Sequence, residues 1–359
     1  MKSESAMEPE WQFALKAYKS LRDRFYDKNA RLYREHDPRQ ANDRPYAFVW
    51  PYSGVMTAVN ALASHSEYGE RFLSDVRELA DSLEEYWNPA GPVPGYDSCV
   101  MRYGSDGRFY DDNEWLGMAL LQAGQLLRDD RLLERARLAF RFAVSGWSEE
   151  MGGGLYWKEG CRDSKNTCSN GPGAVLALQL YEVDPQPEYL DWASRLLDWT
   201  ARLKDPDTGV YWDHLKTDGT VGLATWTYNT GSVLHAHVLL YRHTGNVEAL
   251  SEARRLADAS LRHFAAVKGN EVSFPAMPWF NVVLLRGYLA LREADFEMGE
   301  RCVGAFRSYV RLAWKQGPDK RGLFGRDWSV PTRETETDVR CLLDQAAMVE
   351  AAALLAIVQ

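Results

Sequence analysis

Residues 108–130 read RFYDDNEWLGMALLQAGQLLRDD, an apolar run with a pair of adjacent aspartates at each end. The run is apolar or small on nearly every side, which is typical of a helix that is buried all round. The second pair, Asp129 and Asp130, leads into a segment in which charged and apolar residues alternate at helical spacing. The stretch therefore predicts an inner helix, a short turn and an outer helix.

The same alternation repeats along the whole chain. Inner helices are expected from Tyr52, Asp111, Asn170, Tyr228, Pro278 and Asp338, and outer helices from near Glu10, Arg71, Arg131, Glu188, Val247 and Asp295. Inner-to-outer turns are short, whereas most outer-to-inner loops are long, at roughly 12 to 25 residues, a length that is usually functional. Antiparallel packing then gathers the long loops at one end.

This pattern predicts an all-α protein, an (α/α)6 barrel of six inner and six outer helices that forms one domain over residues 1–359. Strand signals are few. The segments 152–159 and 209–215 are expected to form small β-hairpins on the long-loop face.

Charge and hydropathy exclude several classes of partner. The net charge is −9, which argues against nucleic acid and against an anionic membrane surface as partners. No run of 18 apolar residues is present, so no membrane span is expected. The N-terminus has no apolar signal segment, which predicts a cytoplasmic protein, or a secreted or periplasmic one if a leader has been removed. The sequence does not indicate an oligomeric state.

Cysteine and histidine spacing gives no sign of a metal or cofactor. The five cysteines are scattered and fit neither a disulfide framework nor a zinc site, although a single Cys161–Cys168 bridge stays open. His235 and His237 are two residues apart and do not share a helix face. We expect no metal and no cofactor.

The two aspartate pairs invite different interpretations. Asp129 and Asp130 lie in a short turn before an outer helix, where a carboxylate caps the helix and meets its dipole favourably. Asp111 and Asp112 also precede a helix, but they lie on the long-loop face among aromatic and amide residues. A cap needs only one carboxylate, so this second setting favours catalysis.

Aromatic and amide residues also gather at the N-terminal ends of the other inner helices. Aromatic rings stack on the C–H faces of sugars, and amides and carboxylates bind hydroxyl groups, so the face predicts a sugar-binding cleft. The candidate substrate-binding residues are Trp50, Tyr52, Tyr110, Asn113, Trp115, Asn166, Asn170, Trp226, Tyr228, Asn229, Trp279, Phe280, Asp327 and Trp328.

Two carboxylates in such a cleft suggest glycoside hydrolysis, in which one is a protonated general acid and the other is ionised. Adjacent Cα atoms are ~3.8 Å apart, so Asp111 and Asp112 can reach the ~5–5.5 Å carboxyl separation of a retaining enzyme. They can also splay further apart. The sequence alone therefore leaves the stereochemistry open.

From about Trp50 to the last helix the chain resembles glycoside hydrolase family 76, the α-1,6-mannanases. The resemblance rests on an ordered set of motifs: YDDNEW (110–115), GGGLYW (152–157) followed by KN (165–166), DTGVYWDH (207–214), and WTYNTG (226–231) followed by LLYRHTG (239–245). It implies a retaining hydrolase with Asp111 as nucleophile and Asp112 as acid/base, an α-1,6-linked mannan or mannooligosaccharide as substrate, and no cofactor. The absent leader departs from many such enzymes and leaves a role on imported oligosaccharides open.

Three alternatives remain at this stage. The first is a mannan transglycosylase, and the second is another glycan-active (α/α)6 enzyme such as an epimerase, which would favour histidine pairs in its cleft. The third is a non-catalytic glycan-binding protein.

Overall fold

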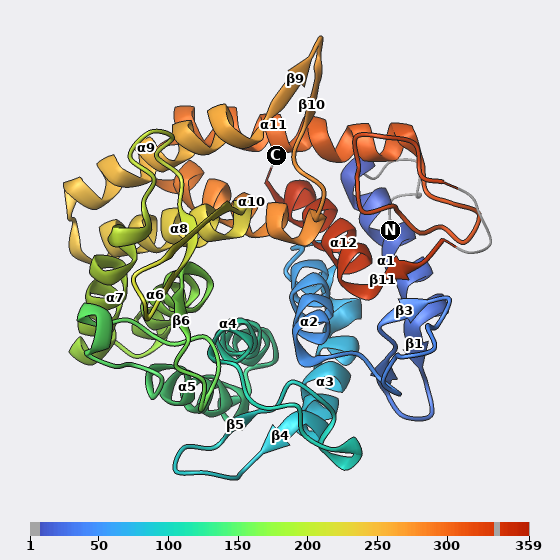
Figure 1. The fold of residues 1–359 in the computed structure, drawn as a ribbon. Helices are drawn as coiled ribbons and strands as arrows, with labels where there is room; N and C mark the ends of the chain where they lie inside the picture. Colours follow the sequence, from blue (N-terminus) through green and yellow to red (C-terminus); the bar gives the residue numbers. More distant parts are fainter. Residues whose placement is uncertain (1–7, 334–337, 359) are drawn as a thin grey trace.

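The computed structural model describes residues 8–333 and 338–358, and within these ranges the chain forms twelve α-helices. Figure 1 shows them as an inner ring surrounded by an outer one. The predicted all-α architecture of six inner and six outer helices is confirmed. No helix in the described ranges has the length and apolarity needed to cross a membrane.

The inner ring is made of the helices whose sequences are apolar nearly all round. Each contacts the next, and contacts of α12 with both α10 and α2 close the ring. The inner helices are α2 (Val49–Ala63), α4 (Tyr110–Leu127), α6 (Thr167–Val183), α8 (Thr227–Thr244), α10 (Pro278–Ala294) and α12 (Leu342–Ile357).

The outer ring consists of amphipathic helices, each packed on an inner helix next to it in the chain. The exception is α1, which packs on α12 and so joins the two ends of the chain in one wall (Figure 1). The outer helices are α1 (Pro9–Phe25), α3 (Leu73–Ser82), α5 (Asp130–Val144), α7 (Pro187–Thr200), α9 (Val247–Phe264) and α11 (Phe296–Gln316).

Glycines allow the inner helices to approach closely. A Cβ atom on Gly231 of α8 would lie 2.5 Å from the Cα of Leu284 on α10. On the facing helix, a Cβ on Gly287 would lie 2.8 Å from the Gly231 carbonyl oxygen. Any side chain at these two positions would push α8 and α10 apart, which explains the small residues seen in the inner-helix sequences.

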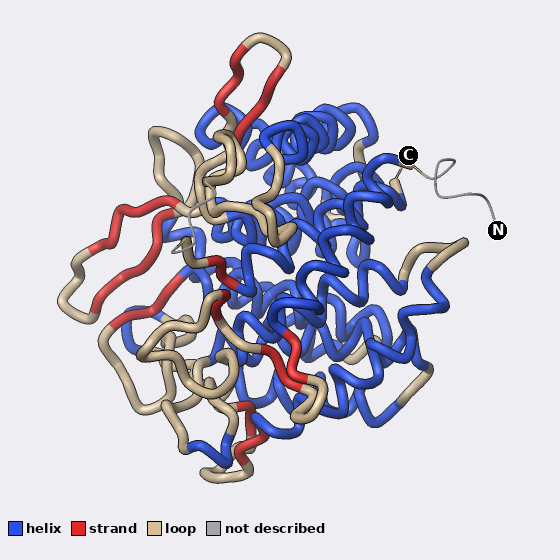
Figure 2. Tube along the Cα trace, turned by 90° about the vertical axis from the view of Figure 1, so that its right-hand side faces the viewer, coloured by secondary structure: helices blue, strands red, loops and turns tan. Residues whose placement is uncertain are grey.

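Loops and strands gather on one face of the barrel, as the loop lengths predicted (Figure 2). The largest sheet has three antiparallel strands in the order β6–β7–β8. The strands are β1 (Tyr26–Asp27), β2 (Leu32–Tyr33), β3 (His36–Asp37), β4 (Trp87–Asn88), β5 (Gly95–Tyr96), β6 (Ser164–Asn166), β7 (Trp212–Lys216), β8 (Val221–Thr225), β9 (Ala266–Lys268), β10 (Glu271–Ser273) and β11 (Arg340–Cys341).

The two predicted hairpins have different outcomes. The 209–215 segment does contribute to a hairpin, because it runs into β7, which pairs antiparallel with β8. The 152–159 hairpin is wrong, because this segment forms only isolated bridges to three separate parts of the chain. Gly152, Gly153 and Gly154 all have positive φ, and the resulting bend directs successive residues to different partners.

Strand pairing also shifts two predicted helix starts. Helix α6 begins at Thr167 rather than Asn170, directly after β6 pairs with β7. Helix α12 begins at Leu342 rather than Asp338, because Arg340 and Cys341 pair with β3. At the opposite face, the capping prediction is confirmed: Asp129 is the N-cap of α5 and accepts a hydrogen bond from the Arg131 amide.

Candidate active site

A cleft of about 970 Å³ opens on the long-loop face. The structure brings many of the predicted residues together in its lining. These are Trp50, Asp111, Asp112, Trp115, Asn166, Trp226, Tyr228 and Phe280. They come from the N-terminal ends of α2, α4, α8 and α10 and from β6, so five separate chain segments converge on one space.

Asp111 and Asp112 occupy the first turn of α4, where the helix dipole favours negative charge. The Asp111 carboxylate accepts a hydrogen bond from the Trp157 indole N–H at 3.0 Å and one from the Asp112 backbone N–H at 3.0 Å. The Cys168 thiol faces the same carboxylate and can donate to it. The donors around Asp111 therefore suit its ionised form.

The two carboxyls differ in electrostatic environment. Burial raises the pKa of Asp111 to about 6, and its hydrogen bonds oppose that rise. Burial, the Asp111 charge and the Asp97 charge together raise the pKa of Asp112 well above its ordinary range. Asp111 is therefore the first of the two to ionise, while Asp112 keeps its proton.

The loop that carries Trp157 is tied firmly to α4 and the segment before it. The Tyr110 amide donates to the Trp157 carbonyl at 3.0 Å, and the Trp157 ring packs edge-on against Phe109. Two residues from this contact in each segment, Arg108 holds Glu159 with hydrogen bonds of 2.8 and 2.6 Å. This bidentate pair holds the loop against the segment before α4.

Lys165 holds the glycine-rich part of the same loop. It is fully buried, and its ammonium donates to the carbonyls of Ser148, Glu150 and Gly153 at 2.6, 2.6 and 2.7 Å. Burial lowers the pKa of Lys165 to about 8. Three carbonyls around one ammonium make Lys165 an anchor for the loop.

Some predicted amide residues anchor loops instead of lining the cleft. Asn113 accepts from the Tyr96 amide at 2.7 Å and donates to the Tyr96 carbonyl at 3.0 Å. Asn170 bonds both backbone groups of Leu155 in the same way. The corresponding residue of α8 is Thr230, whose hydroxyl accepts from the Tyr211 amide at 3.2 Å, whereas the Asn229 amide is fully buried and has no hydrogen-bond partner among the described residues. Asn113 and Asn170 are therefore committed to the protein, and none of the three amides borders the cleft.

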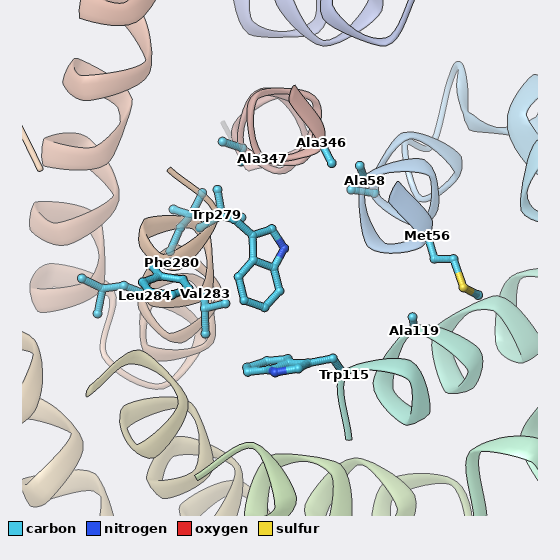
Figure 3. Close-up of a cluster of buried hydrophobic side chains, with 14 of the residues drawn as sticks. Met56, Ala58, Trp115, Ala119, Trp279, Phe280, Val283, Leu284, Ala346 and Ala347 are labelled. Carbon is cyan, nitrogen blue, oxygen red and sulfur yellow. The ribbon is translucent and has the colours of Figure 1, made fainter. Parts of the chain in front are cut away.

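Several predicted aromatic residues are also outside the cleft lining. Tyr52 is fully buried and donates to the Leu79 carbonyl, and Tyr110 packs against Phe142. Trp279 is buried and lies edge-on to Trp50. It also meets Trp115 edge-on (Figure 3).

Asp327 and Trp328, the predicted site residues in the loop before α12, also do not line the cleft. Trp328 is 2% exposed and packs on Tyr309. Asp327 accepts from the amide and hydroxyl of Ser329. The aromatic and acidic residues of this loop thus stabilise the loop itself, and the cleft wall at α12 is left without them.

The cleft also contains residues outside the predicted site set. Trp157 is 44% exposed there, and Asp213 and His214 of β7 border the same space. His214 Nδ1 lies 2.9 Å from Asp213 Oδ2. Successive side chains of a regular strand face opposite sides, so alternation along the 209–215 segment could have indicated only one of these two. The register irregularity between Trp212 and His214 accompanies the placement of both at the cleft.

Within residues 8–333 and 338–358 no group of three His, Cys, Asp or Glu side chains is placed to hold a metal ion. Cys161 and Cys168 are both free thiols, so the bridge that the sequence left open is not formed.

These features define a class: an (α/α)6 barrel with a carboxylate pair in a cleft lined by aromatic residues, an arrangement suited to carbohydrate chemistry. The chain belongs to glycosyl hydrolase family 76, whose family model matches residues 13–356. The resemblance seen in the sequence motifs is thereby confirmed.

Individual relatives agree with this assignment. The mannan endo-1,6-alpha-mannosidase DCW1 of Candida glabrata is 32% identical over 153 residues, which are 38% of this chain and 34% of that protein. The chain thus spans about a third of the length of this curated relative. A family 76 glycoside hydrolase from a bovine Bacteroides thetaiotaomicron strain superposes with a TM-score of 0.90 at 27% identity, covering 98% of this chain and 78% of that one.

A third relative shares the fold at lower identity. It is an inactive variant of the α-1,6-mannanase GH76A of Salegentibacter sp. HEL1_6, with two consecutive aspartates replaced by asparagine, in complex with α-1,6-mannotriose. Its TM-score is 0.82 at 23% identity, covering 98% of this chain and 100% of that chain.

Proposed function

We propose that the protein is a glycoside hydrolase that cleaves α-1,6-mannosidic linkages in mannan or mannooligosaccharides. The observation that carries the proposal is the Asp111–Asp112 pair at the base of a cleft lined by Trp50, Trp115 and Trp226. Family membership supports the reaction class, and the names of its relatives support the substrate.

The proposed mechanism retains anomeric configuration. Asp111, ionised and held by Trp157, attacks the anomeric carbon, and the bond from that carbon to the leaving oxygen breaks as Asp112 gives the oxygen its proton. Asp112 then removes a proton from water, which attacks the same carbon and releases Asp111. Hydrogen-bond donors favour the ionised form of Asp111, whereas burial and like charges favour the protonated form of Asp112, and this difference supports the division of roles.

Digestion of linear α-1,6-mannan tests the proposal directly. New reducing ends would support hydrolysis, whereas redistributed chain lengths without new reducing ends would support the transglycosylase alternative. Unchanged mannan would favour a binding protein. Asp129→Asn is a matched control for Asp111→Asn, since the same chemical change at the other end of α4 should leave turnover nearly intact.

Azide rescue separates the roles of the two aspartates. Asp112→Ala should still form the glycosyl-enzyme from an aryl α-mannobioside with an acidic phenol, and azide should resolve it to the α-azide. Asp111→Ala has no nucleophile, so azide should attack directly and give the β-azide. The reverse products, read by NMR, would exchange the two roles. Inversion by the unmodified enzyme would reject the retaining mechanism.

A further inference from the structure

A second cavity lies on the barrel axis, at the opposite end from the cleft. Its volume is about 290 Å³, and all six inner helices contribute to its wall. Along α4 the lining runs from Trp115 to Gln125, a length of about 15 Å for ten helical residues. Gln125 and Glu182 are exposed at the short-turn end, so the cavity opens on that face.

Trp115 separates this axial cavity from the cleft. Its side chain borders both spaces, and its ring meets Trp279 edge to face with centroids 5.1 Å apart. Figure 3 shows the two indoles meeting inside the inner ring. The axial cavity is therefore a distinct compartment that shares one wall residue with the cleft.

The wall contains a buried ion pair that the proposed hydrolysis does not use. Arg286 holds Glu350 through Nε–Oε1 and Nη2–Oε2 contacts of 2.6 and 2.9 Å, and the Glu350 side chain is only 3% exposed. Thr57 bonds both partners, at 3.1 and 2.9 Å. Buried pairs contribute little net stability compared with apolar residues of the same volume. The pair instead gives the cavity fixed polar groups.

The charges around the axial cavity cancel. Arg286 offsets Glu350, and Glu182 at the mouth lies 3.4 Å from Arg242. Burial and the Arg286 charge lower the pKa of His235 to about 3, so its imidazole is neutral. A lining without net charge offers nothing to a phosphate, a sulfate or a cation, and it suits an uncharged polar ligand.

One polar atom in the wall lacks a partner. Gln179 Oε1 is buried and has no hydrogen-bond partner among the described residues. Buried acceptors are normally satisfied, by protein, water or ligand. Beside it, Trp115, Met118 and Val175 supply apolar surface. The unpartnered acceptor, the neutral amides of Gln122 and Gln125 in the lining and an aromatic ring together match the mixed polar and apolar faces of a pyranose.

The size of the axial cavity is compatible with a single sugar unit. Its volume equals that of roughly ten molecules of liquid water, which is enough for the roughly twelve non-hydrogen atoms of one hexose. We propose that the axial cavity is a second binding site, for one neutral monosaccharide, separate from the cleft and independent of the proposed hydrolysis.

Titration calorimetry of the unmodified protein with D-mannose, D-glucose and D-galactose tests this proposal, together with a crystal soaked in the sugar that binds. We expect a pyranose in the axial cavity. Gln179→Leu should weaken that binding roughly threefold to tenfold through loss of one hydrogen bond, whereas Gln186→Leu on the surface should not. Trp226→Ala, in the cleft, should leave it unchanged.

Two further results decide the outcome. Ala61→Met should abolish axial binding by filling the cavity, and a normal thermal melt for either axial variant shows that the fold persists. The proposal is overturned if none of the three sugars binds, or if sugar binding responds to Trp226→Ala and not to Gln179→Leu. If sulfate or phosphate competes with the sugar for the axial cavity, the conclusion that the cavity binds an uncharged ligand is overturned.

Discussion

Asp111→Asn should make the folded protein more stable while it removes activity. In the native state burial raises the pKa of Asp111 from 3.8 to about 6, a shift of about 2 units. Each unit corresponds to ~1.4 kcal/mol. Because the carboxyl ionises more readily in the unfolded chain, its ionisation lowers the free energy of unfolding by up to ~3 kcal/mol. Asparagine keeps an oxygen to accept from Trp157 and has no charge to bury. We expect a gain of ~1–3 kcal/mol at pH 7.

The pH dependence gives this prediction its sign. A carboxyl whose folded pKa is raised stabilises the native state fully below about pH 4, and that stability is lost as pH rises through about 6. The advantage of Asp111→Asn should therefore be near zero at pH 4 and full at pH 7. Urea unfolding followed by tryptophan fluorescence at the two pH values measures it. Mannan digestion checks the loss of activity.

Asp129→Asn is the control with opposite sign. The Arg131 guanidinium and amide hold the pKa of Asp129 down at about 2, so its contribution is present above the ordinary pKa and is lost as pH falls towards 2. This substitution should destabilise the protein by ~0.3–1 kcal/mol at pH 7, because asparagine keeps the capping oxygen but loses the charge that meets Arg131 and the dipole of α5. Asp111→Asn should depart from its predicted behaviour only if burial does not raise the pKa of Asp111. The assignment is therefore refuted if Asp111→Asn lowers the free energy of unfolding, or if its effect is the same at pH 4 and pH 7.

Three other substitutions have defined outcomes. Trp157→Phe removes one N–H and keeps a ring, so kcat should fall about 10- to 100-fold with KM nearly unchanged. The acid limb of the pH–rate profile should also move to higher pH as the Asp111 carboxylate loses a donor; a KM effect alone would instead indicate a sugar platform. Lys165→Met should cost ~3–5 kcal/mol in urea unfolding, because three buried carbonyls lose their donor. Glu350→Gln should cost ~3–5 kcal/mol by leaving Arg286 buried without its partner, and a loss below ~1 kcal/mol would contradict the burial of that pair.

The sequence could predict the barrel because the hydrophobic pattern of each helix indicates whether the helix belongs to the inner or the outer ring. Segments apolar on all sides became inner helices, and segments with one apolar face became outer ones. Loop length then placed Asp111 and Asp112 on the cleft face and Asp129 on the other. Helix starts near Thr167 and Leu342 were missed, because pairing with distant strands is not encoded in local periodicity.

The cleft lining was harder to predict, since an amide that binds a sugar and an amide that binds a loop look alike in sequence. Asn113 bonds the two backbone groups of Tyr96 in β5, and Asn170 bonds those of Leu155 in the glycine-rich loop. Trp279 likewise differs from Trp226 only in depth: 2% against 37% exposed. Such differences follow from how loops settle on the barrel and not from residue type or spacing.

The two aspartate pairs show how position decides function among identical side chains. Asp112 and Asp129 are separated by α4, which at 18 residues is about 27 Å long. Both pairs lie at helix N-termini, so the dipole cannot distinguish them. The surroundings do: Asp129 meets Arg77 and Arg131 near solvent and its pKa falls, whereas Asp112 meets only like charges in a confined cleft and its pKa rises. A carboxyl that keeps its proton near neutral pH can act as a general acid, and one that ionises near pH 2 cannot. The topology that separates long loops from short turns is therefore what makes one pair a candidate for catalysis and the other a helix cap.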